Sequence, residues 1–480
     1  MSADRFARLA ALRPGRKRAE ARHGGRTPVV ATQEGNALAA LLGADVARNR
    51  YGEHLVVRRW FAQPGEISLP ADVLRALVPD APDETADPGQ WLFLDTETTG
   101  LSGGTGTYAF LVGVAWLDAG GLQVEQYFMR DHTEECSLLA ALAERLAERR
   151  VLVTFNGKAF DWPLLETRFR MTRTLAPRQP LAHLDLLHPA RQLWRLRLGS
   201  VRLTELERGV MGLDRGEDIP PHRIPNVYFD FLRGGHPAPL VAVFHHNRMD
   251  LVGLAAQARR IFSLLTEPAE AGDPLELYGL SRFWFRRDAQ RARLLYERAL
   301  DAGLPRTLDR AARRELARLA KRQRDYARAN ALWAELLPDR RMKTPGLRTA
   351  LSGAMPRSSM VSAKARHALF FRGRPAFLED DLGAALEAFE QLAIHYEHRA
   401  RQPERAAELT GQALRTLEQA LRAGQVPLPR YRRLHSRLAH RLSRLEQRLP
   451  QATQASLEPS KWDLALAAEK RSSRSRASIK

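Results

Sequence analysis

The chain has 480 residues, 44% of them hydrophobic, which is enough for two or three domains with buried cores. Its 75 Lys and Arg residues outnumber 55 Asp and Glu residues, so the formal net charge is +20. Such an excess favours a polyanionic partner such as nucleic acid, although an arginine-rich composition alone also produces it. The single cysteine, Cys136, excludes an intramolecular disulfide and a cysteine-cluster zinc site. We find neither a run of about 20 apolar residues nor a secretory signal, and therefore expect a cytoplasmic protein without a membrane span.

Residues 1–80 are expected to form a basic N-terminal extension that is partly disordered. The first 30 residues carry eight Arg or Lys residues against only Asp4 and Glu20. This composition is typical of a mobile arm that binds a polyanion, and equally of a short solvated helix. The acidic, Pro-rich stretch at 78–90 predicts a linker behind it.

Between residues 88 and 265 the pattern predicts an α/β domain with a mixed sheet flanked by helices. The apolar runs WLFLD and VLVTF predict buried strands, and the segments TYAFLVGVAW and LQVEQYFMR predict a hairpin. Helical spacing predicts helices at 133–149, 160–173, 185–195 and 239–263. Strands that first follow one another and then alternate with helices are typical of such a sheet.

From residue 272 to 450 strand signals almost vanish, and amphipathic helices rich in Ala, Leu and Arg predict an all-α region. Paired helices with aromatic residues such as Tyr296 and Phe389 resemble tetratricopeptide-like (TPR-like) repeats, although a generic helical bundle fits the same pattern. The stretch at 340–365 predicts a loop within this region. The basic tail at 451–480 is expected to be disordered.

Asp95 and Glu97 end the first predicted strand of the α/β domain, in the sequence LDTETTGL. Residues i and i+2 of a strand project from the same face, so the two carboxylates should lie side by side at the sheet edge. Their repulsion is costly unless a cation compensates it, and such oxygen ligands suit Mg²⁺ or Mn²⁺ better than Zn²⁺. An isolated Asp-x-Glu is usually a solvated strand end, but the Thr-Thr-Gly-Leu that follows makes this instance more specific.

Asp161 lies in a second acidic segment, TFNGKAFDWPLL at 154–165, where a strand, a turn and a helix follow one another. Taken alone, Asp161 would also suit the start of a helix, where the macrodipole stabilises a negative charge.

Asp250 lies in a third segment, HHNRMDLVGLAAQARRI at 245–261. His246 precedes Asp250 by four residues, so the two share a helix face, whereas His245 joins them only if the helix begins after it. A lone His–Asp pair on a helix is more often an ordinary surface pair.

Together these three segments resemble the DEDD superfamily of 3′–5′ exonucleases, whose pattern is Asp-x-Glu, a downstream Asp, and a C-terminal Asp preceded by His or Tyr. More narrowly, the region is similar to YprB-type RNase H-like domains that occur with tetratricopeptide repeats. Supporting segments lie at 184–195, 198–213 and 218–235. The resemblance implies an RNase H-like fold for residues 88–265 and says little about the N-terminal extension or the helical half.

The resemblance also implies a two-metal-ion hydrolysis of phosphodiester bonds at single-stranded 3′ ends. Asp95, Glu97, Asp161 and Asp250 would hold two Mg²⁺ or Mn²⁺ ions, one lowering the pKa of the attacking water and one stabilising the leaving oxygen. His246 or His245 would act as the general base. The spacing to Asp250 places His245 where one subgroup has His and His246 where the other has Tyr; helix-face geometry favours His246.

Four further residues are candidate substrate contacts. By the same resemblance, Thr98 would contact the backbone near the 3′ end and Leu101 would pack against the terminal bases, but they also suit a turn hydroxyl and a core leucine. Asn156 most simply forms a turn, and Lys158 would either contact phosphate or lie in solvent. Asp185 falls outside the four-carboxylate pattern and is interpreted as a helix N-cap.

The leading hypothesis is an exonuclease whose helical region binds a protein partner or guides the strand. A catalytically weak nucleic-acid-binding scaffold is the second hypothesis, which the complete set of four carboxylates disfavours, and a structure-specific endonuclease is the third. The chain is too short to hold a polymerase body as well. A zinc enzyme is disfavoured because His183, His188 and His222 lack ligand spacing. Nothing in the sequence distinguishes DNA from RNA as substrate.

Overall fold

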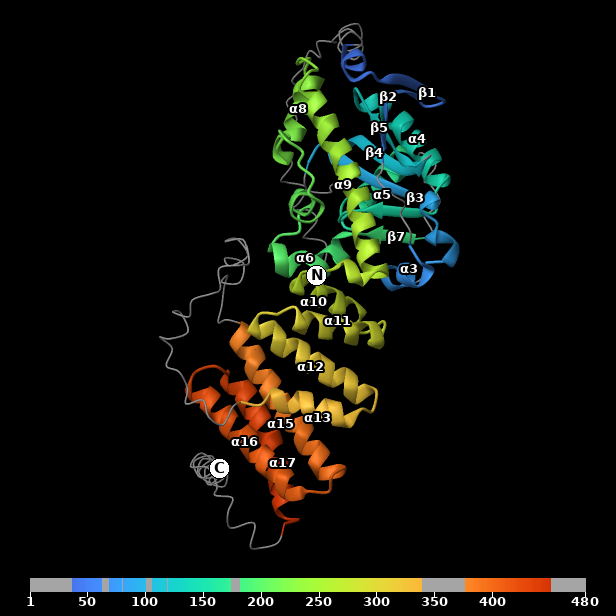
Figure 1. The fold of residues 1–480 in the computed structure, drawn as a ribbon. Coiled ribbons are helices and arrows are strands. Elements are labelled where there is room, and N and C mark those ends of the chain that lie inside the picture. The colour runs from blue at the N-terminus through green and yellow to red at the C-terminus, as the bar shows by residue number, and fades with distance from the viewer. Residues whose placement is uncertain are drawn as a thin grey trace, which may run out of the picture.

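The computed structural model describes residues 37–62, 69–79, 81–100, 106–118, 120–173, 182–338 and 376–449. A sheet domain is followed by a stack of helices, with the two parts joined end to end (Figure 1). Several predicted features lie outside the described residues: the basic arm at 1–30, Leu101, the loop at 340–365 and the tail at 451–480.

Seven strands in the described part of the chain form one mixed sheet, in the order β1-β2-β5-β4-β3-β6-β7. The strands are β1 (Asp45–Asn49), β2 (Gly52–Ala62), β3 (Trp91–Thr98), β4 (Ala109–Asp118), β5 (Gly121–Phe128), β6 (Val151–Thr154) and β7 (Ala182–Asp185). β6 pairs in parallel with β3 and β7, and the other neighbours are antiparallel. This confirms the predicted mixed sheet and its β4–β5 hairpin.

The β1–β2 hairpin extends the sheet beyond the region that the sequence pattern singled out. β2 pairs with β5 over most of its length, from Leu55 opposite Phe128 to Ala62 opposite Gly121. The segment falls within residues 1–80, which the sequence predicts to form a basic N-terminal extension, whereas the structure places it in the sheet. In the structure the sheet therefore begins well before residue 88.

The helices of the sheet domain lie where helical spacing predicted them, together with short ones that the sequence did not indicate. They are α3 (Ala71–Leu77), α4 (Glu135–Ala147), α5 (Asp161–Thr172), α6 (Leu187–Leu198), α7 (Leu203–Leu206), α8 (Ile224–Leu232) and α9 (Leu240–Thr266). Figure 1 shows α9 lying across the sheet and leading into the helices below it.

Alternate residues of β3 enter two different cores. Trp91 and Phe93 pack in the core that contains the second half of α9, whereas Leu92 and Leu94 pack in a second core, which contains α4, α5 and the first turn of α9. Because successive side chains of a strand point to opposite faces, this central strand is buried on both sides. Asp95 and Glu97 continue the every-second-residue pattern of Trp91 and Phe93 along β3. They therefore lie on the same face of the sheet, toward α9.

The second half of the described chain is all-α, as predicted. Its helices are α10 (Pro274–Trp284), α11 (Ala289–Asp301), α12 (Arg306–Arg322), α13 (Tyr326–Glu335), α15 (Ala376–His398), α16 (Pro403–Arg422) and α17 (Leu428–Glu446). Each packs against the next in chain order, while their TPR-like character stays a prediction. In the parts of the chain that the structure describes, no helix combines the length and apolarity needed to cross a bilayer.

Candidate active site

The four predicted carboxylates come from three elements: Asp95 and Glu97 from β3, Asp161 from the start of α5, and Asp250 from α9. Burial, followed by the charges of Asp250, Glu97 and Asp161, raises the pKa of Asp95 well above its usual range. Burial and then the charges of Asp250 and Asp161 do the same to the pKa of Glu97. The four half-buried groups therefore lie close enough to repel one another.

A tight turn after β6 delivers Asp161 to this cluster. Asn156 adopts a left-handed conformation with φ 68°, which Asn tolerates better than most residues. A Cβ at Gly157 would lie 2.5 Å from the side chain of Thr154, so the turn needs glycine there. The Asp185 carboxylate accepts the backbone N–H groups of Asn156 at 2.7 Å and Lys158 at 3.2 Å.

Asp185 also accepts the backbone N–H of Leu187 at 3.1 Å, so it stabilises the start of α6 as well as the turn. The hydroxyl of Thr96 donates to Asp161 at 2.6 Å and fixes the orientation of that carboxylate. Burial nevertheless raises the pKa of Asp161 to about 6, and the charge of Asp185 adds to the shift.

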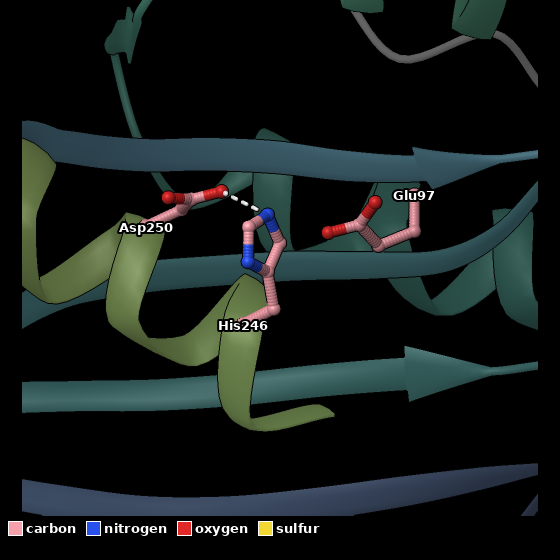
Figure 2. A group of neighbouring side chains, drawn as sticks. All are labelled: Glu97, His246 and Asp250. Carbon is pink, nitrogen blue, oxygen red and sulfur yellow. Dashed lines mark ion pairs between the residues drawn. The ribbon is translucent and has the colours of Figure 1, made fainter. Parts of the chain in front are cut away.

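His246 lies between two acidic side chains. Its Nδ1 is 2.8 Å from both carboxylate oxygens of Asp218, and its Nε2 is 3.4 Å from Asp250 (Figure 2). An ionised carboxylate only accepts hydrogen bonds, so Asp218 favours the tautomer with the proton on Nδ1. In that tautomer Nε2 presents a lone pair toward Glu97 and Asp250, and one ligand atom from each of these three residues lies within 4.8 Å of the others.

His245 points elsewhere. Its Nδ1 accepts a hydrogen bond from Arg248 at 2.9 Å, and the side chain lines a separate cavity beside β2. The structure thus brings His246, but not His245, beside Glu97 and Asp250. The turn of about 100° between successive residues of α9 separates the two imidazoles.

Arg215 is a residue that the sequence analysis did not single out. Its guanidinium forms ion pairs with Glu207, Asp218 and Asp250, at 2.5, 3.3 and 2.5 Å. Arg215 therefore neutralises part of the acidic cluster and connects Asp250 to the partner of His246. No motif spacing indicated it, since it follows a π-helical turn at Glu207–Met211 that has no simple sequence signal.

Asn247, between His246 and Asp250 in the sequence, fixes Asp95. Its amide donates to the Asp95 carboxylate at 2.8 Å and accepts a hydrogen bond from Gln126 at 2.8 Å. Gly113 lies directly opposite Asp95 on β4, and a Cβ there would be 2.2 Å from Asn247 Oδ1. The glycine therefore makes room for the amide.

The remaining predicted substrate contacts have mainly local roles in the structure. The Thr98 hydroxyl donates to the Gly100 carbonyl at 2.9 Å, just after a register shift in β3. Lys158 is exposed, and Leu101 lies outside the described residues. Contacts of these side chains with a substrate remain a prediction.

The donor set fits a hard divalent cation. Among the described residues, Asp95, Glu97 and Asp161 have no ion-pair partner, so Arg215 leaves much of the negative charge uncompensated. Carboxylate oxygens are the ligands that Mg²⁺ and Mn²⁺ prefer. Asp95, Glu97, Asp161 and Asp250 are accordingly the residues that would hold metal.

Comparison with known proteins agrees with the fold. Residues 92–260 match a family model described as RNase_H superfamily, so the chain contains an RNase H-like superfamily domain. The chain is also 34% identical over 252 residues to the "Uncharacterized protein YprB" of Bacillus subtilis (strain 168). This match covers 51% of the chain and 59% of the relative.

A family B DNA polymerase from the hyperthermophilic archaeon Pyrobaculum calidifontis is a more distant structural match. It has 15% sequence identity and a TM-score of 0.32, and the match covers 43% of this chain and 30% of the polymerase. This similarity is too low to inform the function.

Proposed function

We propose that the chain is a metal-dependent 3′–5′ exonuclease that hydrolyses phosphodiester bonds at single-stranded nucleic acid ends. The observation that carries the proposal is the convergence of Asp95, Glu97, Asp161 and Asp250 beside His246. RNase H-like domains with this donor set are suited to phosphoryl transfer assisted by two divalent ions.

Each residue of the cluster has a distinct role in the proposed reaction. The four carboxylates hold the metal ions, which when bound supply Lewis acidity at the scissile phosphate. His246 accepts a proton from the attacking water at Nε2, while Asp218 holds the Nδ1 proton and stabilises the charged ring. Asn247 and Thr96 keep Asp95 and Asp161 in place.

Degradation of 5′-labelled single-stranded DNA and RNA tests the proposal, with Mg²⁺, Mn²⁺ or EDTA in parallel. We expect a stepwise ladder that requires metal and that Asp95→Ala abolishes, with a loss of at least about a thousandfold when one ligand is removed. Asp118→Ala is the matched control, because Asp118 is an exposed carboxylate at the opposite end of the same sheet. The preferred sugar is obtained from the same gels.

Other outcomes identify the competing functions. Fragments that arise first from interior bonds would indicate an endonuclease with the same metal ligands. Nucleic acid binding without cleavage in either metal would indicate a binding scaffold that acts through its helical half. Persistence of the ladder in Asp95→Ala would contradict the assignment of the catalytic cluster.

A further inference from the structure

A cavity of about 480 Å³ lies beside the carboxylate cluster and is separate from it. Its walls come from β2, the helical turn at 37–42, the first turns of α9 and the segment 217–219. Apolar side chains such as Leu42, Val57 and Phe244 line part of it. A volume of this size is typical of pockets that take a small organic group such as a nucleotide.

Two arginines border this cavity without a carboxylate partner. Arg59 donates to the backbone carbonyl oxygens of Leu42 at 2.6 Å and Arg58 at 2.8 Å, and Arg248 donates to His245 at 2.9 Å. Across the described ranges of the chain, neither Arg59 nor Arg248 forms an ion pair. The buried Arg168, by contrast, forms an ion pair with Glu135.

The two guanidinium groups also repel each other. Burial and then the positive charge of Arg59 lower the pKa of Arg248. Glu217 is the one carboxylate among the described lining residues, and its side chain is exposed. The lining therefore has an excess positive charge next to an apolar wall, which suits a ligand with an anionic and an apolar part.

The cavity is adjacent to the proposed catalytic residues on two elements. On α9, His245 lines the cavity while His246, the next residue, contacts Asp218. In the segment after Arg215, Glu217 and Ile219 line the cavity while Asp218 lies between them. Val57 on the cavity wall lies in the same cross-strand row as Asp95, three strands away, so a strand bound by its end at the carboxylates would reach the cavity after about 14 Å.

We propose that the cavity binds one nucleotide of the single strand whose 3′ end lies at the carboxylates, with its phosphate between Arg59 and Arg248 and its base against the apolar wall. This inference rests on the proposed function for the identity of the strand. Arginine is suited to the role because its planar guanidinium donates two parallel hydrogen bonds to phosphate oxygens. Arg59 comes from β2, outside residues 92–260, so the hairpin would add a substrate contact to the RNase H-like domain.

Binding of a fluorescent single-stranded oligonucleotide to the full chain in EDTA tests the inference without cleavage. The variant Arg59→Ala/Arg248→Ala is compared with Arg432→Ala/Arg433→Ala, which removes the same charge from an exposed part of α17. We expect the cavity variant to bind about tenfold more weakly than this control, with a salt dependence shallower by about 0.7 per lost phosphate contact. Glu217→Gln should tighten binding, because it removes the opposing charge.

Three results would overturn the inference. The first is that the cavity variant binds the oligonucleotide as tightly as the control does. The second is that Glu217→Gln weakens binding. The third is that thymidine monophosphate binds as tightly as the oligonucleotide and depends on the same arginines. The last result would identify a mononucleotide site. Arg59 also contacts the turn at 37–42, so Arg59→Ala could change binding by disturbing that turn. The binding change in Glu217→Gln does not depend on this contact.

A second substrate separates this inference from the proposed function. The p-nitrophenyl ester of thymidine monophosphate carries a single nucleoside, so it has no further nucleotide to place in the cavity when its phosphate lies at the carboxylates. With Mn²⁺, the cavity variant should lose a larger factor of activity on the strand than on this ester. If the unsubstituted chain hydrolyses neither substrate, the proposed function fails, and the EDTA binding data still decide whether the arginines bind a strand.

Discussion

At the scale of one residue, Asp95 shows how the carboxylate cluster lowers the free energy of unfolding of the metal-free chain. It is half-buried among like charges, and Asn247 is its single side-chain hydrogen-bond donor in the described part of the chain. Asp95→Asn keeps the shape and an acceptor for Asn247 but removes the charge. We expect it to stabilise the metal-free fold by about 1–2 kcal/mol, because removal of repelling buried charges is favourable. Thermal unfolding in EDTA measures this effect.

With Mg²⁺ present, the order of thermal stability of the unsubstituted chain and Asp95→Asn should reverse. The unsubstituted chain should gain thermal stability from the ion, since a ligand that binds only the folded state stabilises it, and Asp95→Asn should gain less. Asp118→Asn, at the other end of the sheet, should leave both measurements unchanged. A destabilised Asp95→Asn that retains the full Mg²⁺ response would contradict the proposed metal ligand.

Gly113 also supports the carboxylate cluster, because its lack of a side chain leaves room for Asn247 beside Asp95. In Gly113→Ala the new Cβ would lie 2.2 Å from Asn247 Oδ1 and 2.8 Å from Leu251, and Asn247 is already held by Gln126. Overpacking of this kind costs about 1–3 kcal/mol and should weaken metal binding by displacing the amide from Asp95. Urea unfolding and Mn²⁺ titration measure the two effects. Gly272→Ala, with no heavy atom within 4 Å, is the control.

At the scale of secondary structure, the sequence predicted the site residues that lie on elements with a clear strand or helix periodicity. The apolar run of β3 and the i, i+2 rule placed Asp95 and Glu97 on one face, and helical spacing placed His246 and Asp250 together on α9. The sequence could not reveal Asp218 and Arg215, because their contacts depend on how a loop of irregular conformation folds back onto α9.

The β1–β2 hairpin was missed for a related reason. Arg58 and Arg59 follow the apolar residues of β2, so the strand lacks the alternation that sequence analysis uses. Its pairing with β5 is a tertiary interaction between segments far apart in the chain. Such long-range pairing overrides local pattern, and only the fold reveals it.

The packing of β2 on α4 predicts a pH-dependent stability. His54 is buried on β2, with Nδ1 2.8 Å from the Ser137 hydroxyl and no hydrogen-bond partner for Nε2 among the described residues. Burial, followed by the charges of Arg130 and Arg58, lowers the pKa of His54 from 6.5 to about 4. Between these values the unfolded state binds the proton and the folded state does not.

The free energy of unfolding should therefore fall as the pH decreases from 6.5 toward 4, by roughly 2–3 kcal/mol for this one histidine. Urea denaturation across this pH range measures the change. His54→Gln should flatten part of the dependence, and the remainder would include His183, whose pKa burial also lowers to about 4. An equally steep dependence in His54→Gln would exclude His54 as its source.

At the scale of the whole molecule, α10 joins the sheet domain to the helical region. It packs against α6, and a Cβ at Gly279 would lie 2.6 Å from the carbonyl oxygen of Gln192 and 2.8 Å from that of Leu193. The same junction contains a hydrogen bond of 2.6 Å from Trp194 to Glu276. One core contains residues of β3, α6 and α10, so the first helices of the helical region pack on the sheet domain, while residues of α13, α15, α16 and α17 share a second core.

Gly279→Ala should weaken that junction, because both clashing atoms belong to the backbone and cannot rotate away. We expect a loss of about 1–3 kcal/mol, with the helical region unfolding before the sheet domain. Urea unfolding followed by circular dichroism, together with limited proteolysis, detects the separation. Gly411→Ala in α16 is the control, since its nearest neighbour is the mobile end of Arg415 at 3.5 Å and alanine favours helix by up to about 1 kcal/mol. A single unshifted transition in Gly279→Ala would mean that the two halves do not depend on this close approach.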